Sequence, residues 1–220
     1  GTQSNGQGHE TVYAQFLSDQ TGIPSEKITV VQGDSDLISN GGGTGGSRSV
    51  TVQNNATLAT IEKVITSFSQ YLSEKLKVDA NDIEFDDISF RIRDSNFSPN
   101  VLEVAKMARD DQRFDLLTHS AKTTLDARSF PNGAHFAELE IDPETGFVQI
   151  VRYSVVDDFG NLINPMLAEG QVHGGVAQGI GQALYEHVVY DQEGQLLTAT
   201  FMDYGMPRAE DLPFYKFNTE

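Results

Sequence analysis

Amide, histidine and hydroxyl side chains gather around three glycine-rich patches of the 220-residue chain, at residues 6–8, 41–46 and 170–181. Amide side chains both donate and accept hydrogen bonds, which suits a heterocycle that bears carbonyl, amine and ring N–H groups. Backbone N–H groups that glycine leaves accessible at a helix N-terminus suit phosphate. The patches therefore predict a site for an anionic heterocycle, with amide contacts from Gln3, Asn5, Gln7, Asn40, Gln171 and Gln178.

The distribution of charge favours the same interpretation. The chain carries 32 Asp and Glu against 15 Lys and Arg, a formal net charge of −17, yet residues 37–61 contain no carboxylate where the chain average predicts about four. Arg48 is the one charged side chain in that stretch, and residues 170–185 also lack Asp and Glu. Keeping carboxylates away from glycine loops favours an anion site. A buried helix face that excludes charge would give the same pattern, and this alternative stays open for the helix after Val50.

Known nucleotide-binding motifs fit these patches poorly. Residues 41–47 look like a phosphate-binding P-loop, but Ser47-Arg48 stands where that motif requires Lys followed by Ser or Thr. Neither 6–8 nor 179–181 completes the glycine fingerprint of dinucleotide-binding folds. Glycine also serves tight turns and close packing, so each patch taken alone is compatible with a structural role.

Catalytic and metal-ligating groups are scarce. The five histidines show no metal-ligand spacing; His9 and His173 lie inside glycine patches, and we interpret the other three as surface or packed residues. No nucleophile elbow is present, and Ser47 is equally suited to cap a helix. Without cysteine, the chain can hold no disulfide, iron–sulfur cluster or thiolate metal site. Residues 82–87 are interpreted as a solvated acidic face.

Composition also narrows the partners. The negative charge disfavours nucleic acid and anionic membranes, and no apolar run approaches the roughly 18 residues that span a bilayer. The first residues show no secretory leader, so we expect a cytoplasmic protein, with the periplasm as the alternative. The absence of an initiator methionine indicates a processed or excised piece.

Each patch is expected to be a loop that leads into a helix. Apolar i,i+4 pairs over residues 12–17 predict a first helix that ends near Gly22, and a short helix is expected over 101–107. Two apolar rows predict further helices: the long stripe Leu58, Ile61, Ile65, Phe68, Leu72 and Leu76, and the row Val172, Val176, Ile180 and Leu184.

Strands are predicted at 28–31, 88–92 and 196–201, and alternation predicts a hairpin of 137–141 with 147–156 around the turn 142–146. This mixed order favours an α+β fold with mixed sheets. We expect one domain over residues 1–220, with sub-lobes 1–130 and 131–220 as a division within it.

Five segments occur together in the order and spacing of one known family: GQGHET (6–11), GGTGGSRS (42–49), Asn164-Pro165, EGQVHGGVAQGIG (169–181) and MDYGMPR (202–208). Through them the chain resembles the large, molybdenum-binding subunit of the xanthine oxidase, aldehyde oxidoreductase and carbon monoxide dehydrogenase family. The resemblance covers nearly the whole chain, with residues 77–130 matching loosely. It implies the cofactor-binding domain of a molybdenum hydroxylase, cut from a larger subunit.

That resemblance implies a cofactor and its contacts. The cofactor would be molybdopterin, in its cytosine dinucleotide form, with molybdenum held by the pterin dithiolene rather than by protein ligands. Gln7 would face the pterin and metal region, Gly8 and His9 would approach the phosphates, and Gln178 would bond near the molybdenum oxo group. Main-chain and hydroxyl donors would come from Thr44, Gly45, Gly46, Ser47, Arg48 and Ser49.

The resemblance also implies a reaction and its partners. The parent enzyme would oxidise an aldehyde, a heterocycle or a CO-like small molecule with oxygen from water, and iron–sulfur and flavin (FAD) centres would lie on partner subunits or domains. The family's general base, a glutamate in a Gly-x-Gly-Glu motif, is expected beyond residue 220, so we expect no catalytic residue in this chain and no turnover by the chain alone. Apolar surface exposed by the cut would favour self-association. Two alternatives remain: a non-catalytic scaffold with the same fold, and an unrelated nucleotide-binding domain.

Overall fold

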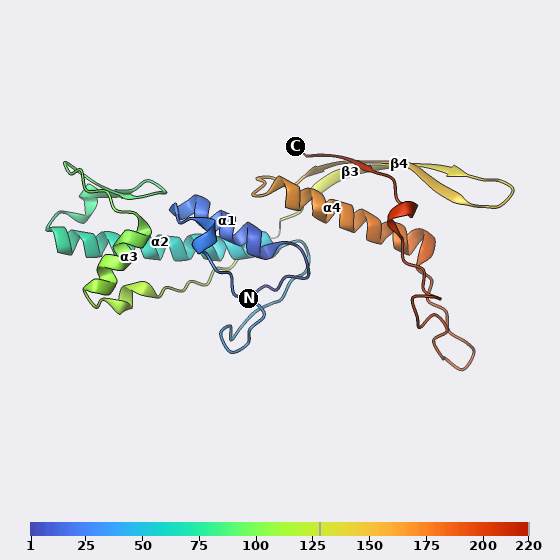
Figure 1. The fold of residues 1–220 in the computed structure, drawn as a ribbon, viewed down its shortest axis with the longest axis horizontal. Helices are drawn as coiled ribbons and strands as arrows, with labels where there is room; N and C mark the ends of the chain where they lie inside the picture. Colours follow the sequence, from blue (N-terminus) through green and yellow to red (C-terminus); the bar gives the residue numbers. More distant parts are fainter. Residues whose placement is uncertain (128, 220) are drawn as a thin grey trace. The chain divides into compact units, whose positions relative to one another are not determined.

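The computed structural model describes residues 1–127 and 129–219, and the chain divides into two compact units, Gly1–Ser129 and Phe130–Glu220. Figure 1 shows both units along the chain. Each unit has its own cluster of buried apolar side chains, so each is described by itself. No helix among the described residues is long and apolar enough to cross a membrane.

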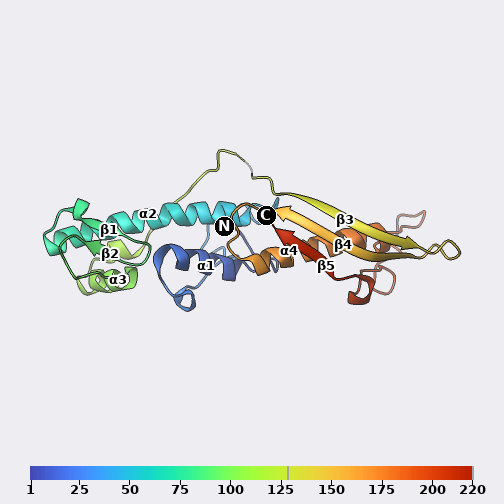
Figure 2. The ribbon, with the colours of Figure 1, turned by 90° about the horizontal axis from the view of Figure 1, so that it is seen from above.

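The first unit is mainly helical, and α1 runs beside the longer α2 (Figures 1 and 2). Its elements are α1 (His9–Thr21), the 3-10 turn η1 (Ser25–Lys27), α2 (Ser49–Leu76), η2 (Ala80–Asp82), β1 (Ile83–Phe85), β2 (Phe90–Ile92), α3 (Val101–Asp110) and η3 (Phe114–Leu117). Gly22, with φ 67°, ends α1 in the left-handed conformation that glycine adopts most easily. The helices predicted after the first two glycine patches and at residues 101–107 are thus confirmed.

The apolar stripe of α2 forms most of the first unit's core. Phe68 and Leu72 are buried and pack with Phe90 of β2 and with Val104 of α3. Leu58, at the start of the predicted stripe, is 37% exposed. Burial of the stripe therefore begins at Ile61, and the hairpin and α3 cover its C-terminal part.

The acids of segment 82–87 are exposed or half-exposed, as expected of a solvated acidic face, but the segment also contains a strand. Ile83–Phe85 form β1, antiparallel to β2, with Ile83 buried and Glu84 exposed. The flanking acids are used in ion pairs: Asp82 with Arg93 at 2.6 Å and Asp86 with Arg91 at 2.6 Å. The two apolar residues among the acids were the sequence signal for this strand.

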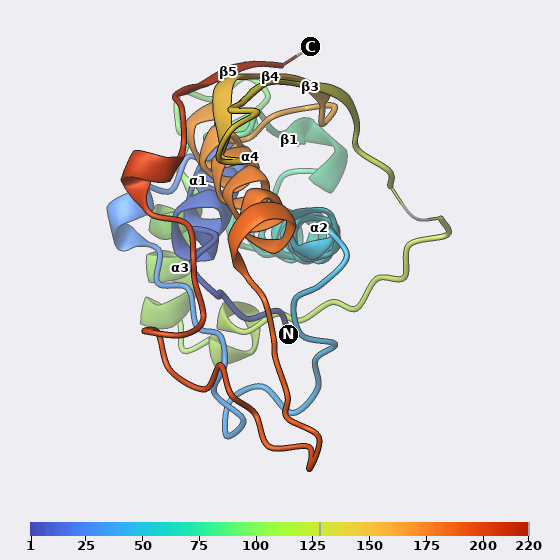
Figure 3. The same cartoon turned by 90° about the vertical axis from the view of Figure 1, so that its right-hand side faces the viewer.

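The second unit is a three-stranded sheet with a helix beneath it (Figure 3). Its elements are β3 (Asn132–Ile141), β4 (Val148–Asp158), α4 (Pro165–Ile180), the π-helix η4 (Gly181–Tyr185), η5 (Ala209–Asp211) and β5 (Tyr215–Thr219). The strand order is β3-β4-β5, antiparallel between β3 and β4 and parallel between β4 and β5. The predicted hairpin, its turn at Gly146 (φ 74°) and a mixed sheet are confirmed.

The third glycine patch is not a loop before a helix, which corrects that expectation. Asn164 caps α4 by accepting a hydrogen bond from the N–H of Leu167 at 3.0 Å, and Pro165 occupies the first helical position. The helix therefore begins five residues before Gly170, and the glycines lie inside it. Only the row Val172, Val176 and Ile180 is buried, against β4 and β5, and Leu184 is 40% exposed.

Two predicted strands are absent. Residues 28–32 have no regular structure, and residues 196–201 contribute only an isolated bridge between Leu196 and Tyr190 before a series of turns. The third strand of the sheet is instead β5, whose Tyr215 pairs with Tyr153 of β4. The apolar residues at 28–31 and 196–201 find no partner strand among the described residues, so their strand propensity has nothing to pair with.

Candidate functional site

The segment that precedes the first glycine patch, residues 1–3, lies against the second patch in the first unit. The carbonyl oxygen of Gly1 accepts a hydrogen bond from the N–H of Gly43 at 3.2 Å. Thr44 Oγ1 accepts from the N–H of Gln3 at 3.2 Å and donates to the Gln3 carbonyl at 2.5 Å. Ser49 Oγ donates to Thr44 Oγ1 at 3.2 Å, which ties the loop to the start of α2. Residues 1–3 and 41–44 are thus hydrogen-bonded to each other, and Thr44 links the second patch to Ser49 of α2.

The N-terminal segment is also anchored to α1. Thr2 Oγ1 lies 3.0 Å from the hydroxyl oxygen of Tyr13, and both residues are buried. Burial raises the pKa of Tyr13 above its ordinary value, against the lowering effect of the bond to Thr2. Tyr13 in turn stacks on His9, with ring centroids 4.9 Å apart. Buried contacts with Tyr13 therefore hold the N-terminal segment against α1.

The N-termini of α1 and α2 differ from those of α3 and α4 in how they are capped. No side chain caps α1, whose N-cap is Gly8 (φ 73°), or α2, whose N-cap is Arg48. By contrast, Asn100 forms a capping box with α3, and Asn164 caps α4. The first-turn N–H groups of a helix have no intrahelical acceptor. The two helices that follow glycine loops thus keep these donors available for a ligand.

The loop 41–46 leaves open space beside most of its glycines. A Cβ atom added at Gly43, Gly45 or Gly46 would meet no atom within 4 Å. Gly41 and Gly42 differ: a Cβ at Gly41 would lie 2.4 Å from the carbonyl oxygen of Gly1, and one at Gly42 would lie 3.3 Å from Nη2 of Arg48. One glycine lets the two loops approach each other, and the others leave the backbone accessible.

The remaining candidates in this unit have mixed surroundings. Gln7 is half-buried, and its Oε1 accepts from Ser4 Oγ at 3.3 Å and from the N–H of Asn5, so that its Nε2 is unpaired within the described residues. His9 is 2% exposed, and its Nδ1 lies 3.2 Å from Gln32 Oε1. Ser47 (φ 53°) and Arg48 are exposed beside the start of α2. The side chain of His9 therefore has structural partners, while Gln7, Ser47 and Arg48 keep free donors.

Gln178 lies in the second unit, on the exposed side of α4. Along α4, a Cβ at Gly170 or Gly174, or at the cavity-lining Gly175 and Gly179, would meet nothing within 4 Å. The structure thus brings the candidates of the first and second patches together in one unit, while Gln178 belongs to the other, separately described unit.

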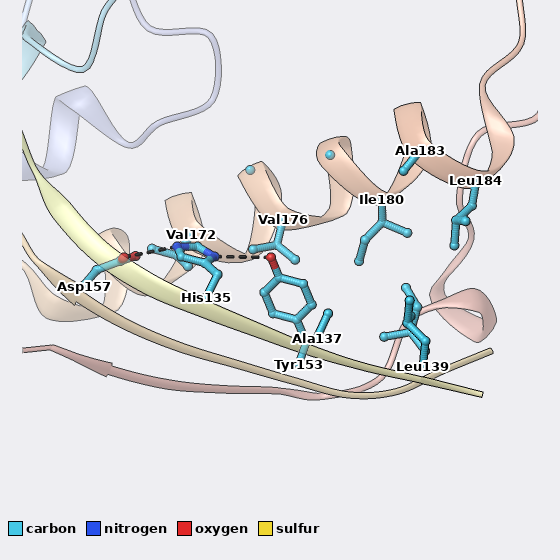
Figure 4. A pocket seen from close by; sticks show the side chains of 13 residues that line it. His135, Ala137, Leu139, Tyr153, Asp157, Val172, Val176, Ile180, Ala183 and Leu184 are labelled. Carbon is cyan, nitrogen blue, oxygen red and sulfur yellow. Dashed lines mark hydrogen bonds and ion pairs between the residues drawn. The ribbon is translucent and has the colours of Figure 1, made fainter. Parts of the chain in front are cut away.

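Sequence reasoning missed a polar cluster in the second unit. His135 Nε2 lies 3.2 Å from Asp157 Oδ1, and its Nδ1 lies 3.3 Å from the hydroxyl oxygen of Tyr153 (Figure 4). Asp157 is 8% exposed. The cluster closes one end of a cavity of about 470 Å³ between β3 and α4, whose other walls are apolar. The signal was present in the alternation of β3 and β4, which places these three side chains on the same face of the sheet.

No group of three or more His, Cys, Asp or Glu able to hold a metal ion occurs among residues 1–127 and 129–219. His119, interpreted as packed or on the surface, bonds through Nε2 to the Leu116 carbonyl at 2.8 Å and meets Phe68 edge-on. His173 lies 3.7 Å from Glu169 and contacts the ring of Tyr215. What the candidate site offers is therefore hydrogen-bond donors and accessible backbone.

A model of the molybdopterin cofactor-binding domain matches residues 1–213. The chain belongs to this molybdopterin cofactor-binding family. The family expected from the five sequence segments is confirmed, as is its α+β fold.

Relatives of this molybdopterin-binding chain are subunits of oxidoreductases. It is 35% identical over 218 residues to the gamma subunit of the 6-hydroxypseudooxynicotine dehydrogenase complex of Paenarthrobacter nicotinovorans, over 97% of this chain and 28% of that protein. It is 33% identical to the carbon monoxide dehydrogenase large chain of Afipia carboxidovorans, over 97% and 27%. A crystal structure of Cu,Mo-CO dehydrogenase in its carbon monoxide reduced state matches with a TM-score of 0.89 and 32% identity, over 100% and 28%. The chain thus spans less than a third of the relatives it matches.

Proposed function

We propose that the chain binds the molybdopterin cofactor of a molybdenum hydroxylase through residues 1–9 and 41–49, with Gln178 as a further contact. The free N–H groups of the first turn of α2 would hold phosphate, because that helix end carries a partial positive charge and no acidic side chain. Thr44, Ser47 and Ser49 would add hydroxyl donors, and Arg48 a positive charge.

The other proposed contacts follow from which hydrogen-bond donors each residue has unpaired. Gln7 would use its unpaired Nε2 to bond to the pterin. His9 would contribute through its backbone N–H in the first turn of α1, since its ring is already held by Gln32 and Tyr13. Gly45 and Gly46 would let the cofactor approach the backbone, as the open space beside them allows. These roles suit a cytosine dinucleotide form, which carries two phosphates.

When bound, the molybdenum–pterin group would supply two-electron oxidation of an aldehyde, a heterocycle or a CO-like substrate with oxygen from water. This chain's own residues bind and orient the cofactor. The general base would be the glutamate that the family resemblance implies beyond residue 220, and residues 37–61 and 170–185 would supply no carboxylate for that role. Iron–sulfur and flavin partners would receive the electrons.

The contrast in helix capping carries this proposal: α1 and α2 have no side-chain cap, whereas α3 and α4 do. The test is molybdenum content in the longer native protein, measured by mass spectrometry for Gly46→Asp and Gly146→Asp. Both glycines have a positive φ (64° and 74°) and open space for a Cβ, but only Gly46 adjoins α2.

We expect about one molybdenum per chain in the native protein and in Gly146→Asp, and at least about a tenfold loss in Gly46→Asp, because a carboxylate at a helix N-terminus competes with phosphate for the same donors. Native protein without molybdenum would favour the scaffold alternative. Retention of a plain nucleotide without a pterin would favour the nucleotide-binding alternative. Equal molybdenum in both variants would overturn the assignment of the site to α2.

A further inference from the structure

The strand β3 is an open edge that shows few of the features by which proteins protect such edges. It is ten residues long, every residue in it is exposed, and β4 is its one neighbour within the described residues. It contains no proline and no lysine. The bulge in the β3–β4 ladder adds its extra residue, Val151, to β4 and leaves the alternation of β3 uninterrupted. Long unprotected edges are templates for another strand.

The two faces of β3 carry different chemistry. Ala137 and Leu139 point toward the cavity beneath the sheet, as Figure 4 shows, and Leu139 is 52% exposed. Glu138 and Glu140 alternate with them and so lie on the opposite face. Glu138 has Arg152 at 3.7 Å, whereas Glu140 has no cationic partner among the described residues. A strand added beside β3 would therefore meet an apolar face and an acidic face.

The cavity leaves room for the side chains of such a strand. Its walls on the helix side include Gly175 and Gly179 of α4, where an added Cβ would meet nothing within 4 Å. Val176 and Ile180 form the apolar floor. Side chains from a strand next to β3 would bury Leu139 and fill this space, which is the usual completion of a sheet with one helix beneath it.

The surface of the whole chain also indicates a missing partner. Its accessible area is 15302 Å², whereas two fully separate compact units of the same total mass, 24.1 kDa, would expose about 12,000 Å². Charge selects among partners, because residues 130–220 carry 14 carboxylates against three Lys or Arg side chains. A second copy would bring two such acidic surfaces together.

We propose that β3 pairs with a β-strand from polypeptide outside residues 1–220, apolar on the side that faces the cavity and basic on the side of Glu138 and Glu140. The strand extends the sheet from three strands to four and covers the cavity at its open side. The pairing uses none of the proposed cofactor contacts, because residues 1–9 and 41–49 lie in the other unit and Gln178 does not line the cavity.

The probe for this test is an eight-residue peptide of alternating valine and lysine, titrated into the 220-residue chain at physiological salt with amide NMR and hydrogen exchange as readouts. We expect changes in the amide chemical shifts along β3 and slower hydrogen exchange at alternate β3 amides. A valine–glutamate peptide should cause neither change. The matched variants are Glu140→Lys, in β3, and Glu144→Lys, in the hairpin turn.

Glu140→Lys should weaken binding about fivefold, because an opposite-charge cross-strand pair becomes a like-charge pair, and Glu144→Lys should leave it nearly unchanged. Equal weakening by both variants would show general charge attraction and overturn the proposal. So would absence of binding, or a chain that dimerises through β3 without peptide. Molybdenum content is a separate measurement, so failure here leaves the cofactor assignment standing.

Discussion

Individual glycines in the loop 41–46 have different physical roles. Gly41 lies so close to Gly1 that no side chain fits between the two backbones, whereas Gly45 adjoins open space. Sequence alone could not predict which role each glycine has, because both belong to the same glycine-rich loop. The distinction depends on the contact between residues 1–3 and 41–44, which is non-local.

Substituting Gly41 by alanine should detach the N-terminal segment from the loop, because the new Cβ would meet backbone atoms that cannot rotate away. We expect faster hydrogen exchange at Gly43, whose N–H bonds to Gly1, and faster proteolysis within residues 1–8. Gly45→Ala is the control, with no clash and no positive φ. Similar exchange in the two variants would contradict the pairing of the loops.

Asp86 gives a prediction for pH. The side chain of Arg91, with the N–H groups of Ser89 and Ile88, holds the pKa of the Asp86 carboxyl at about 2, below its ordinary value. A depressed folded-state pKa adds stability above the unfolded pKa of about 3.9, and this contribution is lost as pH falls toward about 2. Asp86→Asn should therefore be less stable than wild type at pH 7, and the difference should shrink as pH falls through about 2, as measured by urea unfolding. A difference that does not change with pH would contradict the ionised interaction.

Elements with a strong local pattern were predictable, and those that depend on distant pairing were not. The stripe of α2 and the alternation around the turn at Gly146 specify their structures within a few turns or residues. β5 has a comparable pattern, but its role depends on Tyr215 reaching Tyr153 of β4, 62 positions earlier in the chain. The third glycine patch was misplaced because Asn164-Pro165, a strong local start signal, lies before it and begins α4 earlier.

Two apolar residues of the hairpin β1–β2 region, one buried and one exposed, test whether packing on the core decides their contribution to stability. Phe90 is 0% exposed and packs on Phe68 and Phe85, with ring centroids 6.2 and 4.9 Å away, whereas Ile88 is 61% exposed. Phe90→Ala should lower the free energy of unfolding of the first unit by about 3–5 kcal/mol, because it leaves a cavity in the core. Ile88→Ala should cost less than about 1 kcal/mol. Comparable losses on urea denaturation would mean that the hairpin does not pack on α2 as described.

The accessible surface of the chain is larger than its mass requires. The proposed cofactor loops also lack one kind of functional group, a carboxylate that could act as a base. The loops that we propose for the cofactor provide donors and one positive charge but no carboxylate within residues 37–61. Glu10, exposed in the first turn of α1, is the nearest acid in sequence to the first patch. We therefore propose that binding and proton transfer belong to different parts of the parent protein.

It follows that the 220-residue chain supplied with molybdopterin cofactor should show no turnover, because no carboxylate of the glycine loops can serve as the general base. The assay would offer an aldehyde, an N-heterocycle and carbon monoxide with a dye as electron acceptor, beside the longer native protein as the active control. Oxidation by the chain alone would contradict the assignment of the base to residues beyond 220. If that activity were lost in Glu10→Gln while cofactor content stayed constant, the base would be Glu10, and the chain would hold both binding and proton-transfer functions within its first unit.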